Sequence, residues 1–184
     1  MTDAADAADA ADAVEAVEPV ERVVRASCEA DWEATRAIRL RALCEAPTAF
    51  GSTYAHEQGF DEAAWRARAA RPAAVLAFAG DEPVGIAGSY HDDELPPGTW
   101  EVVSMFVAPP HRGSGLAVRL IDATIASARD SGAERFALWV TETNSGARQR
   151  YLRYGFVETG ERAPLPSDPS LAEIRMVLPT DDGS

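Results

Sequence analysis

The sequence predicts an α/β (α+β) fold in which helices cover a mixed central sheet of about seven strands. Two near-continuous apolar runs, at residues 102–107 and 136–140, have the β-branched and aromatic composition of strands buried on both faces. An amphipathic helical segment separates them, so we expect the two strands to lie parallel and to be joined through that helix. With 184 residues, the chain is long enough for one well-buried core and too short for two ordinary domains.

The first half of the chain predicts short strands and amphipathic helices. Residues 20–27 alternate apolar and charged side chains, as a half-buried strand does. Asp31 can cap a helix, and Ala46-Pro47 ends that helix because the residue before a proline avoids helical backbone. The other elements expected here are helical stretches at 53–58 and 61–70, then strands at 73–79 and 84–90 that form a hairpin around a turn at 80–83.

The second half is organised by one strand and the helix that follows it. The strand at 101–107 stops before Pro109 and Pro110, which cannot donate to a sheet, and a helix begins in the glycine-rich turn 112–117. Gly132 ends this helix. The remaining expected elements are a strand at 135–141, a helix at 145–154 between Asn144 and Gly155, strands at 156–160 and 171–178, and a loop at 163–169 between these two strands.

The two ends of the chain have compositions that predict disorder. Residues 1–19 repeat Ala-Ala-Asp and carry six acids and no base, so we expect a disordered acidic N-terminal segment. We expect residues 20–178 to form the folded domain and residues 179–184 to be a disordered tail. No apolar stretch is long enough to span a membrane, and the N-terminus is acidic where a signal peptide is basic, which predicts a cytoplasmic protein with no membrane partner.

Charge and cysteine content exclude several classes of protein. The formal net charge is −13, from 30 acids against 17 bases, all arginine, which makes nucleic acid a poor partner. An acidic body weakly favours cationic substrates, and it equally suits a surface charged only for solubility. No metal or disulfide is expected, because the three histidines lack ligand spacing and Cys28 and Cys44, which we expect to pack in the core, lack Cys-x-x-Cys spacing.

The turn between the central strand and its helix is a candidate anion site. Such a turn presents several unpaired N–H groups and the positive end of the helix dipole at one point, where phosphates bind. Small residues at Gly113, Gly115 and Ala117 allow a pyrophosphate to approach the backbone, which a larger side chain would prevent. The glycine pattern alone also fits a turn that binds nothing.

Two motifs make this interpretation more specific. Arg112, Gly115 and Ala117 resemble the acetyl-CoA signature Gln/Arg-x-x-Gly-x-Gly/Ala of the GCN5-related N-acetyltransferase (GNAT) superfamily. Downstream, Asn144 precedes Tyr151 by seven residues and Gly-Phe follows, which is similar to the next helix of that family. The resemblance covers most of the chain and implies the order strand, two helices, three strands, helix, strand, helix, two strands, with the two parallel central strands splayed apart at their C-terminal ends.

The resemblance also implies how acetyl-CoA would bind as cosubstrate. The pantetheine arm would lie between the strands at 101–107 and 136–141, and the turn would hold the pyrophosphate. Asn144 would contact the cosubstrate or only cap its helix. The residues expected to bind acetyl-CoA are Phe106, Val107, Arg112, Gly113, Ser114, Gly115, Leu116, Ala117, Val118 and Asn144.

Direct attack of a primary amine on the thioester requires a base and an acid. Glu101 resembles the base glutamate of the histone-acetylating branch of the family, and Glu142 and His91 are weaker candidates. Tyr151 stands at the position of the family's general-acid tyrosine, which would protonate the departing thiolate. Alternatively, Glu101 is only an exposed acid at a strand end and Tyr151 only a buried structural side chain. A backbone N–H of the central strand would stabilise the oxyanion.

Other functions stay open at this point. A non-catalytic acyl-CoA-binding module would use the same turn, and another donor such as succinyl-CoA would place Arg148 or Arg150 near its acyl tail. The acceptor is a small-molecule or protein amine of unknown identity, and a homodimer is compatible with the resemblance. Five aromatic residues either line the pocket for the acceptor amine or pack in the core: Trp32, Phe50, Tyr54, Trp65 and Tyr90.

Overall fold

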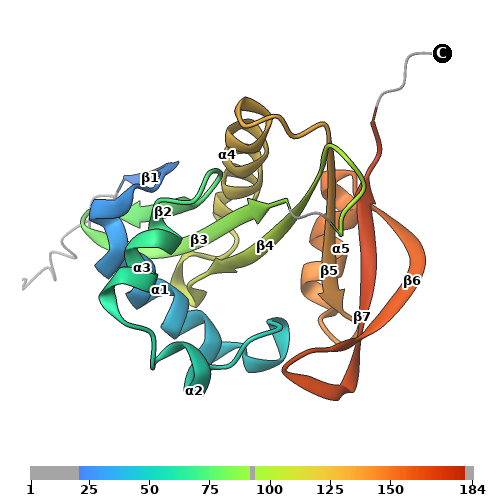
Figure 1. Cartoon of the computed structure of the whole chain (residues 1–184), viewed down its shortest axis with the longest axis horizontal. Helices are drawn as coiled ribbons and strands as arrows, with labels where there is room; N and C mark the ends of the chain where they lie inside the picture. The colour runs from blue at the N-terminus through green and yellow to red at the C-terminus, as the bar shows by residue number, and fades with distance from the viewer. Residues whose placement is uncertain (1–20, 92–93, 181–184) are drawn as a thin grey trace, which may run out of the picture.

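A computed structural model describes residues 21–91 and 94–180, which form a seven-stranded mixed sheet between two layers of helices (Figure 1). The predicted segment at 1–19 and the last residues of the predicted tail, 181–184, lie outside the described residues. The elements are β1 (Arg22–Ala26), α1 (Trp32–Glu45), α2 (Tyr54–Glu57), α3 (Glu62–Ala69), β2 (Val75–Ala79), β3 (Glu82–Tyr90), β4 (Thr99–Val107), α4 (Leu116–Asp130), β5 (Arg135–Thr141), α5 (Ser145–Tyr154), β6 (Val157–Leu165) and β7 (Asp168–Leu178), with short 3-10 turns at Glu29–Asp31, Pro47–Ala49 and Pro109–His111.

The strands lie side by side in the order β1-β2-β3-β4-β5-β7-β6. The pair β4 and β5 is parallel, and the five other neighbouring pairs are antiparallel. The predicted fold class, the parallel central pair and the crossover through α4 are therefore confirmed. In Figure 1, α1 and α3 cover one face of the sheet, and α4 and α5 cover the other.

The parallel pairing of β4 with β5 is short. It joins three residue pairs, from Thr99 with Arg135 to Glu101 with Ala137, and beyond Glu101 the two strands diverge (Figure 1). On its other side, β4 carries a bulge, because its register with β3 passes from Phe106 to Val103 while β3 advances only from Ile86 to Gly88. The bulge includes Ser104, whose backbone is left-handed at φ 59. The central sheet is thus split where β4 bends away from β5.

The hydrophobic core forms two clusters that meet at α4. Leu116 and Leu120 pack with α1 and the β2–β3 hairpin, whereas Ile121, Ile125 and Ala128 pack with β5, α5 and β7. These residues confirm the predicted amphipathic helix. The helix ends at Asp130 with Ser131 as its C-cap, and Gly132 follows with the left-handed φ of 97 that glycine adopts without strain.

The predicted loop at 163–169 is wrong. β6 continues to Leu165 and β7 begins at Asp168, so the two strands form one long hairpin. Prolines in this stretch suggested a loop, but Pro164 lies on the edge strand β6, Pro166 lies in the turn, and Pro169 lies in β7 before the residues that pair with β5. The tip of the hairpin is anchored, since Leu165 is fully buried and the Ser167 hydroxyl donates to the Phe50 carbonyl at 2.6 Å.

Two smaller expectations have different outcomes. Cys28 and Cys44 are exposed, so the prediction that they pack in the core is wrong: Cys28 lies just after β1, and Cys44 lies in the last turn of α1 beside the buried Leu43 but outside its buried face. Within residues 21–91 and 94–180, none of the helices is both long and apolar enough to cross a bilayer. The cytoplasmic location stays a prediction.

Candidate active site

The turn between β4 and α4 is shaped by two glycines. Gly113 and Gly115 both have φ of 78, a conformation that residues with a side chain rarely adopt. A Cβ atom at either position would meet no atom within 4 Å, so glycine is required by the backbone and not by crowding inside the protein. The space next to both glycines is open.

The same turn presents unpaired backbone donors. In the part of the chain that the structure describes, the first backbone bonds at this end of α4 are those that Val118 and Arg119 donate to the Gly115 carbonyl, at 3.1 and 3.2 Å. The N–H groups of residues 113–117 donate to no backbone acceptor there. With the positive end of the helix dipole, they form a site suited to an anion.

Arg112 fixes this turn to the end of the central strand. Its Nε donates to the Val107 carbonyl at 2.9 Å, and its guanidinium lies 5.8 Å from the centre of the Phe106 ring. The Ser114 hydroxyl donates to the His111 carbonyl at 2.7 Å. The Val107 carbonyl and the Ser114 hydroxyl therefore have partners within the turn, whereas the backbone N–H groups expected to hold the pyrophosphate do not.

A groove of about 530 Å³ runs from this turn along α5, and we call it the turn groove. Its positively charged lining consists of Arg112, Arg150 and Arg153. Asn144 lines it as well, and its Oδ1 accepts the Ala147 N–H at 3.2 Å, so the predicted helix cap is present. The groove combines open N–H groups with three guanidinium groups, which is the chemistry that phosphates need.

Tyr151 lies at the inner end of the turn groove. The residue is 8% exposed and packs edge-on against Phe156, with ring centres 5.7 Å apart. Burial raises the pKa of its phenol to about 12, so the hydroxyl keeps its proton at neutral pH. Tyr151 also lines a narrow passage of about 60 Å³ between the diverging strands, with Val103 and Met105 of β4 and Val140 of β5. The split in the sheet is therefore a real opening.

The passage leads to a second cavity of about 630 Å³, which we call the glutamate cavity. Glu101 of β4 and Glu173 of β7 both line it. Burial raises the pKa of Glu173, and the charge of Glu101 raises it further. The two carboxylates thus face the same space, and one of them binds a proton more readily than an ordinary glutamate. Such a group is suited to accept a proton from an amine near neutral pH.

A buried ion cluster forms the helix wall of the glutamate cavity. Glu57 of α2 is 1% exposed, and its carboxylate accepts bonds from Arg39 Nη2 at 2.7 Å and from Arg68 Nη1. Burial alone would raise the pKa of Glu57, but the hydrogen bonds and charges of Arg39 and Arg68 outweigh this effect and lower it to about 2. The cluster ties α1, α2 and α3 together.

The three candidate bases differ in whether they line the glutamate cavity. Glu101 lines the glutamate cavity, whereas Glu142 pairs with Arg162 at 3.0 Å and His91 Nδ1 lies 2.8 Å from the Thr99 carbonyl. Neither Glu142 nor His91 lines the cavity. Sequence reasoning missed Glu173, although an acid inside the apolar run at 171–178 was a signal. It also missed Glu57, whose short helix has no pattern that would have indicated burial.

The five aromatic candidates fall into two groups. Phe50 and Tyr90 line the glutamate cavity, together with Phe60 and Trp139, which the sequence did not single out. The other three lie elsewhere: Trp65 is 1% exposed in the core, Trp32 packs against the core beneath Arg66, and Tyr54 is 43% exposed.

The structure thus combines a split central sheet with a candidate anion-binding turn beside it, and a sequence comparison identifies the family. A sequence model of the acetyltransferase (GNAT) family matches residues 38–156. The chain belongs to this family.

Curated relatives match part of the chain. N-acetyltransferase 8F1 of Rattus norvegicus is 32% identical over 89 residues, which cover 47% of this chain and 40% of that protein. N-acetyltransferase 8B of the same species is 32% identical over 91 residues, covering 48% and 41%. The match thus spans about two fifths of the length of each relative.

Solved structures match nearly the whole chain. YncA, a putative acetyltransferase of Salmonella typhimurium solved with acetyl-CoA, has a TM-score of 0.68 and 20% identity, covering 89% of this chain and 96% of that one. Diaminobutyrate acetyltransferase EctA of Paenibacillus lautus, solved with its substrate L-2,4-diaminobutyric acid and coenzyme A, has a TM-score of 0.67 and 15% identity, covering 90% and 98%. At these identities the likeness establishes the fold.

The ion cluster predicts how stability depends on pH. Because the pKa of Glu57 is near 2 in the folded protein and 4.5 is its ordinary value, the stabilisation is complete above about pH 5 and is lost as the pH falls toward 2. This carboxyl accounts for about 3 kcal/mol of the free energy of unfolding. In urea titrations, Glu57→Gln should be less stable than the wild type at pH 7, and the difference should narrow toward pH 2.

The exposed Glu62 on α3, which pairs with Arg66 at 2.7 Å, supplies the control. Glu62→Gln should change the free energy of unfolding by less than about 1 kcal/mol at each pH. A deficit of Glu57→Gln that stays constant between pH 7 and pH 2 would contradict the role assigned to its charge.

Proposed function

We propose that the protein is an acetyl-CoA-dependent N-acetyltransferase that transfers the acetyl group to a primary amine by direct attack within a ternary complex. One observation carries the proposal: the passage that Tyr151 lines borders both the turn groove and the cavity of Glu101 and Glu173, since it shares lining residues with each. An acid and a base are thus available on the two sides of the space where an amine and a thioester would meet.

The turn groove fits the cosubstrate. Its N–H groups and three arginines suit the phosphates of acetyl-CoA, and the passage between β4 and β5 suits the narrow pantetheine arm. The solved structures of YncA with acetyl-CoA and of EctA with coenzyme A support this assignment. The residues proposed to bind acetyl-CoA are Phe106, Val107, Arg112, Gly113, Ser114, Gly115, Leu116, Ala117, Val118 and Asn144.

Glu101 removes a proton from the acceptor amine, directly or through water. An alkylammonium ion has a pKa near 10, so only about one molecule in a thousand is neutral at pH 7 without such a base. Glu173 shares the cavity, and its raised pKa makes it the second candidate for this proton. The pair also attracts the ammonium form of the acceptor before it is deprotonated.

The neutral amine then attacks the thioester carbonyl. A carbon–nitrogen bond forms, the carbon–sulfur bond breaks, and a backbone N–H of Phe106 or Val107 stabilises the oxyanion. Tyr151 donates its phenolic proton to the departing sulfur, and the extra proton that the attached nitrogen releases through water restores the phenol. Since the pKa of this phenol is about 12 and that of a thiol is near 8.5, full transfer runs uphill, and the gain comes from the position of the donor.

The choice of donor also has structural support. Of the two arginines that would suit succinyl-CoA, Arg148 is paired with Glu158 and does not line the turn groove, whereas Arg150 does line it. Arg150 shares the groove with the phosphate-binding turn, so we assign it to the phosphates of the cosubstrate and propose acetyl-CoA as the donor.

The direct test is release of thiol from acetyl-CoA in the presence of an amine library, with calorimetry of acetyl-CoA binding beside it. We expect binding, and turnover of at least one amine. Binding without any turnover would favour a non-catalytic acyl-CoA-binding module, and no binding would remove the proposal. Stronger thermal stabilisation by succinyl-CoA than by acetyl-CoA would instead assign the other donor.

Removal of the phenol of Tyr151 should slow the chemical step. Tyr151→Phe is expected to lower kcat by about 10² to 10⁴ while calorimetry shows unchanged acetyl-CoA binding. Tyr154→Phe on the same helix is the control, because the Tyr154 hydroxyl donates to Asp122 at 2.7 Å and does not line the turn groove. An unchanged kcat in Tyr151→Phe would exclude the phenol as the acid.

Replacement of the base should alter the pH profile. Glu101→Gln is expected to flatten the acidic limb of kcat/KM, because the group whose deprotonation produces that limb is gone. Glu142→Gln, outside the cavity, should keep the limb. If the limb persists in Glu101→Gln and disappears in Glu173→Gln, the base is Glu173 and not Glu101.

A further inference from the structure

We propose that the acceptor is a free amino acid, whose carboxylate binds Arg71 while its amine lies at the Glu101 and Glu173 side of the glutamate cavity. This inference rests on the proposed acetyltransferase function and assigns the substrate class and a specificity-determining residue of the same site.

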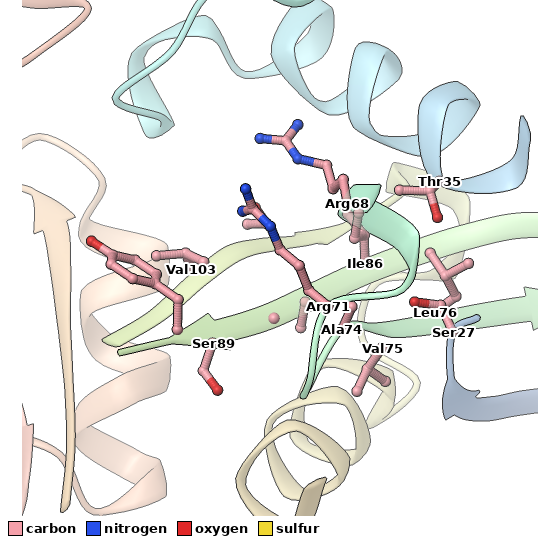
Figure 2. A pocket seen from close by; sticks show the side chains of 14 residues that line it. Ser27, Thr35, Arg68, Arg71, Ala74, Val75, Leu76, Ile86, Ser89 and Val103 are labelled. Carbon is pink, nitrogen blue, oxygen red and sulfur yellow. The ribbon is translucent and has the colours of Figure 1, made fainter. Parts of the chain in front are cut away.

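Arg71 lies just after α3 and lines the glutamate cavity, as Glu101 and Glu173 do. Figure 2 shows the side chains of Arg68 and Arg71 extending to the same side of β3, where Val103 also lies. Among residues 21–91 and 94–180, the Arg71 side chain has no hydrogen-bond or ion-pair partner, whereas Arg39 and Arg68 both bind Glu57. Its five donors are therefore available to a ligand in the cavity.

The wall that contains Arg71 has an excess of positive charge. Arg39, Arg68 and Arg71 all line the cavity on that side, and Glu57 is the carboxylate set among them. Arg39 Nη1 is buried without a hydrogen-bond partner, which shows that Glu57 does not satisfy every donor of the cluster. This concentration of guanidinium groups occurs in a chain with 30 acids and 17 bases, where an arginine has many potential partners. An anion supplied by the substrate would balance the wall.

The strand wall of the same cavity has the opposite charge. Glu101 and Glu173 place two carboxylates on the strand side of the cavity, near the passage that leads to Tyr151. A molecule with an amine at one end and a carboxylate at the other matches both walls, whereas a polyamine matches only one. Arginine binds a carboxylate through two parallel hydrogen bonds, which adds geometric selectivity to the charge.

The remaining lining indicates an apolar side chain on the acceptor. Phe50, Phe60 and Trp139 contribute aromatic surface between the charged walls. A peptide N-terminus lacks a carboxylate close to its amine, so the two-sided charge favours free amino acids over protein amines.

The test compares acceptors that differ only in the carboxylate. Three matched sets are assayed for thiol release from acetyl-CoA: L-phenylalanine, its amide and phenethylamine; L-leucine, its amide and isoamylamine; 4-aminobutyrate, its amide and butylamine. We expect kcat/KM to be roughly 10- to 100-fold higher for the carboxylate member of at least one set. In Arg71→Gln this preference should disappear through a raised KM, with kcat/KM for the amide and the amine unchanged.

Arg71→Lys should restore part of the preference, because it keeps the charge and loses the paired geometry. Arg36→Gln, an exposed position on α1 outside the cavities, is the control and should behave as the wild type. Equal or better turnover of amides and amines by the wild type, or a preference that survives Arg71→Gln, would overturn this inference and leave the acetyltransferase proposal intact. Absence of turnover with every amine would instead refute the proposed function, and the inference with it.

Discussion

The separation of β4 from β5 is the constraint on which the rest of the site depends. Parallel pairing ends at Glu101, and the bulge at Ser104 turns β4 away from its neighbour. A continuous sheet would close the passage, and Tyr151 and Glu101 would lie in separate compartments. The separation loses a few hydrogen bonds between the strands and places Ser104 in left-handed backbone. The backbone strain at such a residue costs of order 1–3 kcal/mol and is tolerated where the surrounding structure is well packed.

The site depends, second, on the ion cluster of Glu57, Arg39 and Arg68 in the helix wall of the glutamate cavity. α2 has four residues, far fewer than an isolated helix needs to be stable in water. Its Glu57 is held by guanidinium groups from α1 and α3, so the short helix is fixed by tertiary contacts and not by its own propensity. Removal of one partner would leave a buried charge uncompensated, so a change in any one of the three residues destabilises the whole wall. The cavity therefore has one wall set by strand geometry and one set by buried charge.

Much of the fold and part of the site could be predicted from the sequence, because these features depend on local sequence patterns. β5 and α5 begin and end at the predicted residues, because a buried strand has a continuous apolar run and α5 has Asn144 at one end and Gly155 at the other. The turn at 112–117 was recognisable since only glycine adopts its backbone without strain. The hairpin at 163–169 was not, because its prolines are tolerated only where β6 lies at the sheet edge and where β7 extends beyond β5, and strand order is not visible in a local pattern. Glu173 and Glu57 depend on contacts between distant segments, which single-sequence reasoning does not supply.

The acidic net charge weakly favoured a cationic substrate, but net charge is a poor guide to the ligand of one cavity. At physiological ionic strength, exposed charges more than about 8 Å apart are largely screened, so a total of −13 says little about one cavity. Three of the 17 arginines line the turn groove and three line the glutamate cavity. The lining of the turn groove contains no carboxylate, whereas the three arginines of the glutamate cavity lie on the helix side, with Glu57 among them, and Glu101 and Glu173 lie on the strands. Both groups of arginines suit an anionic ligand, whereas the carboxylates that could attract an amine are confined to the strand wall between them.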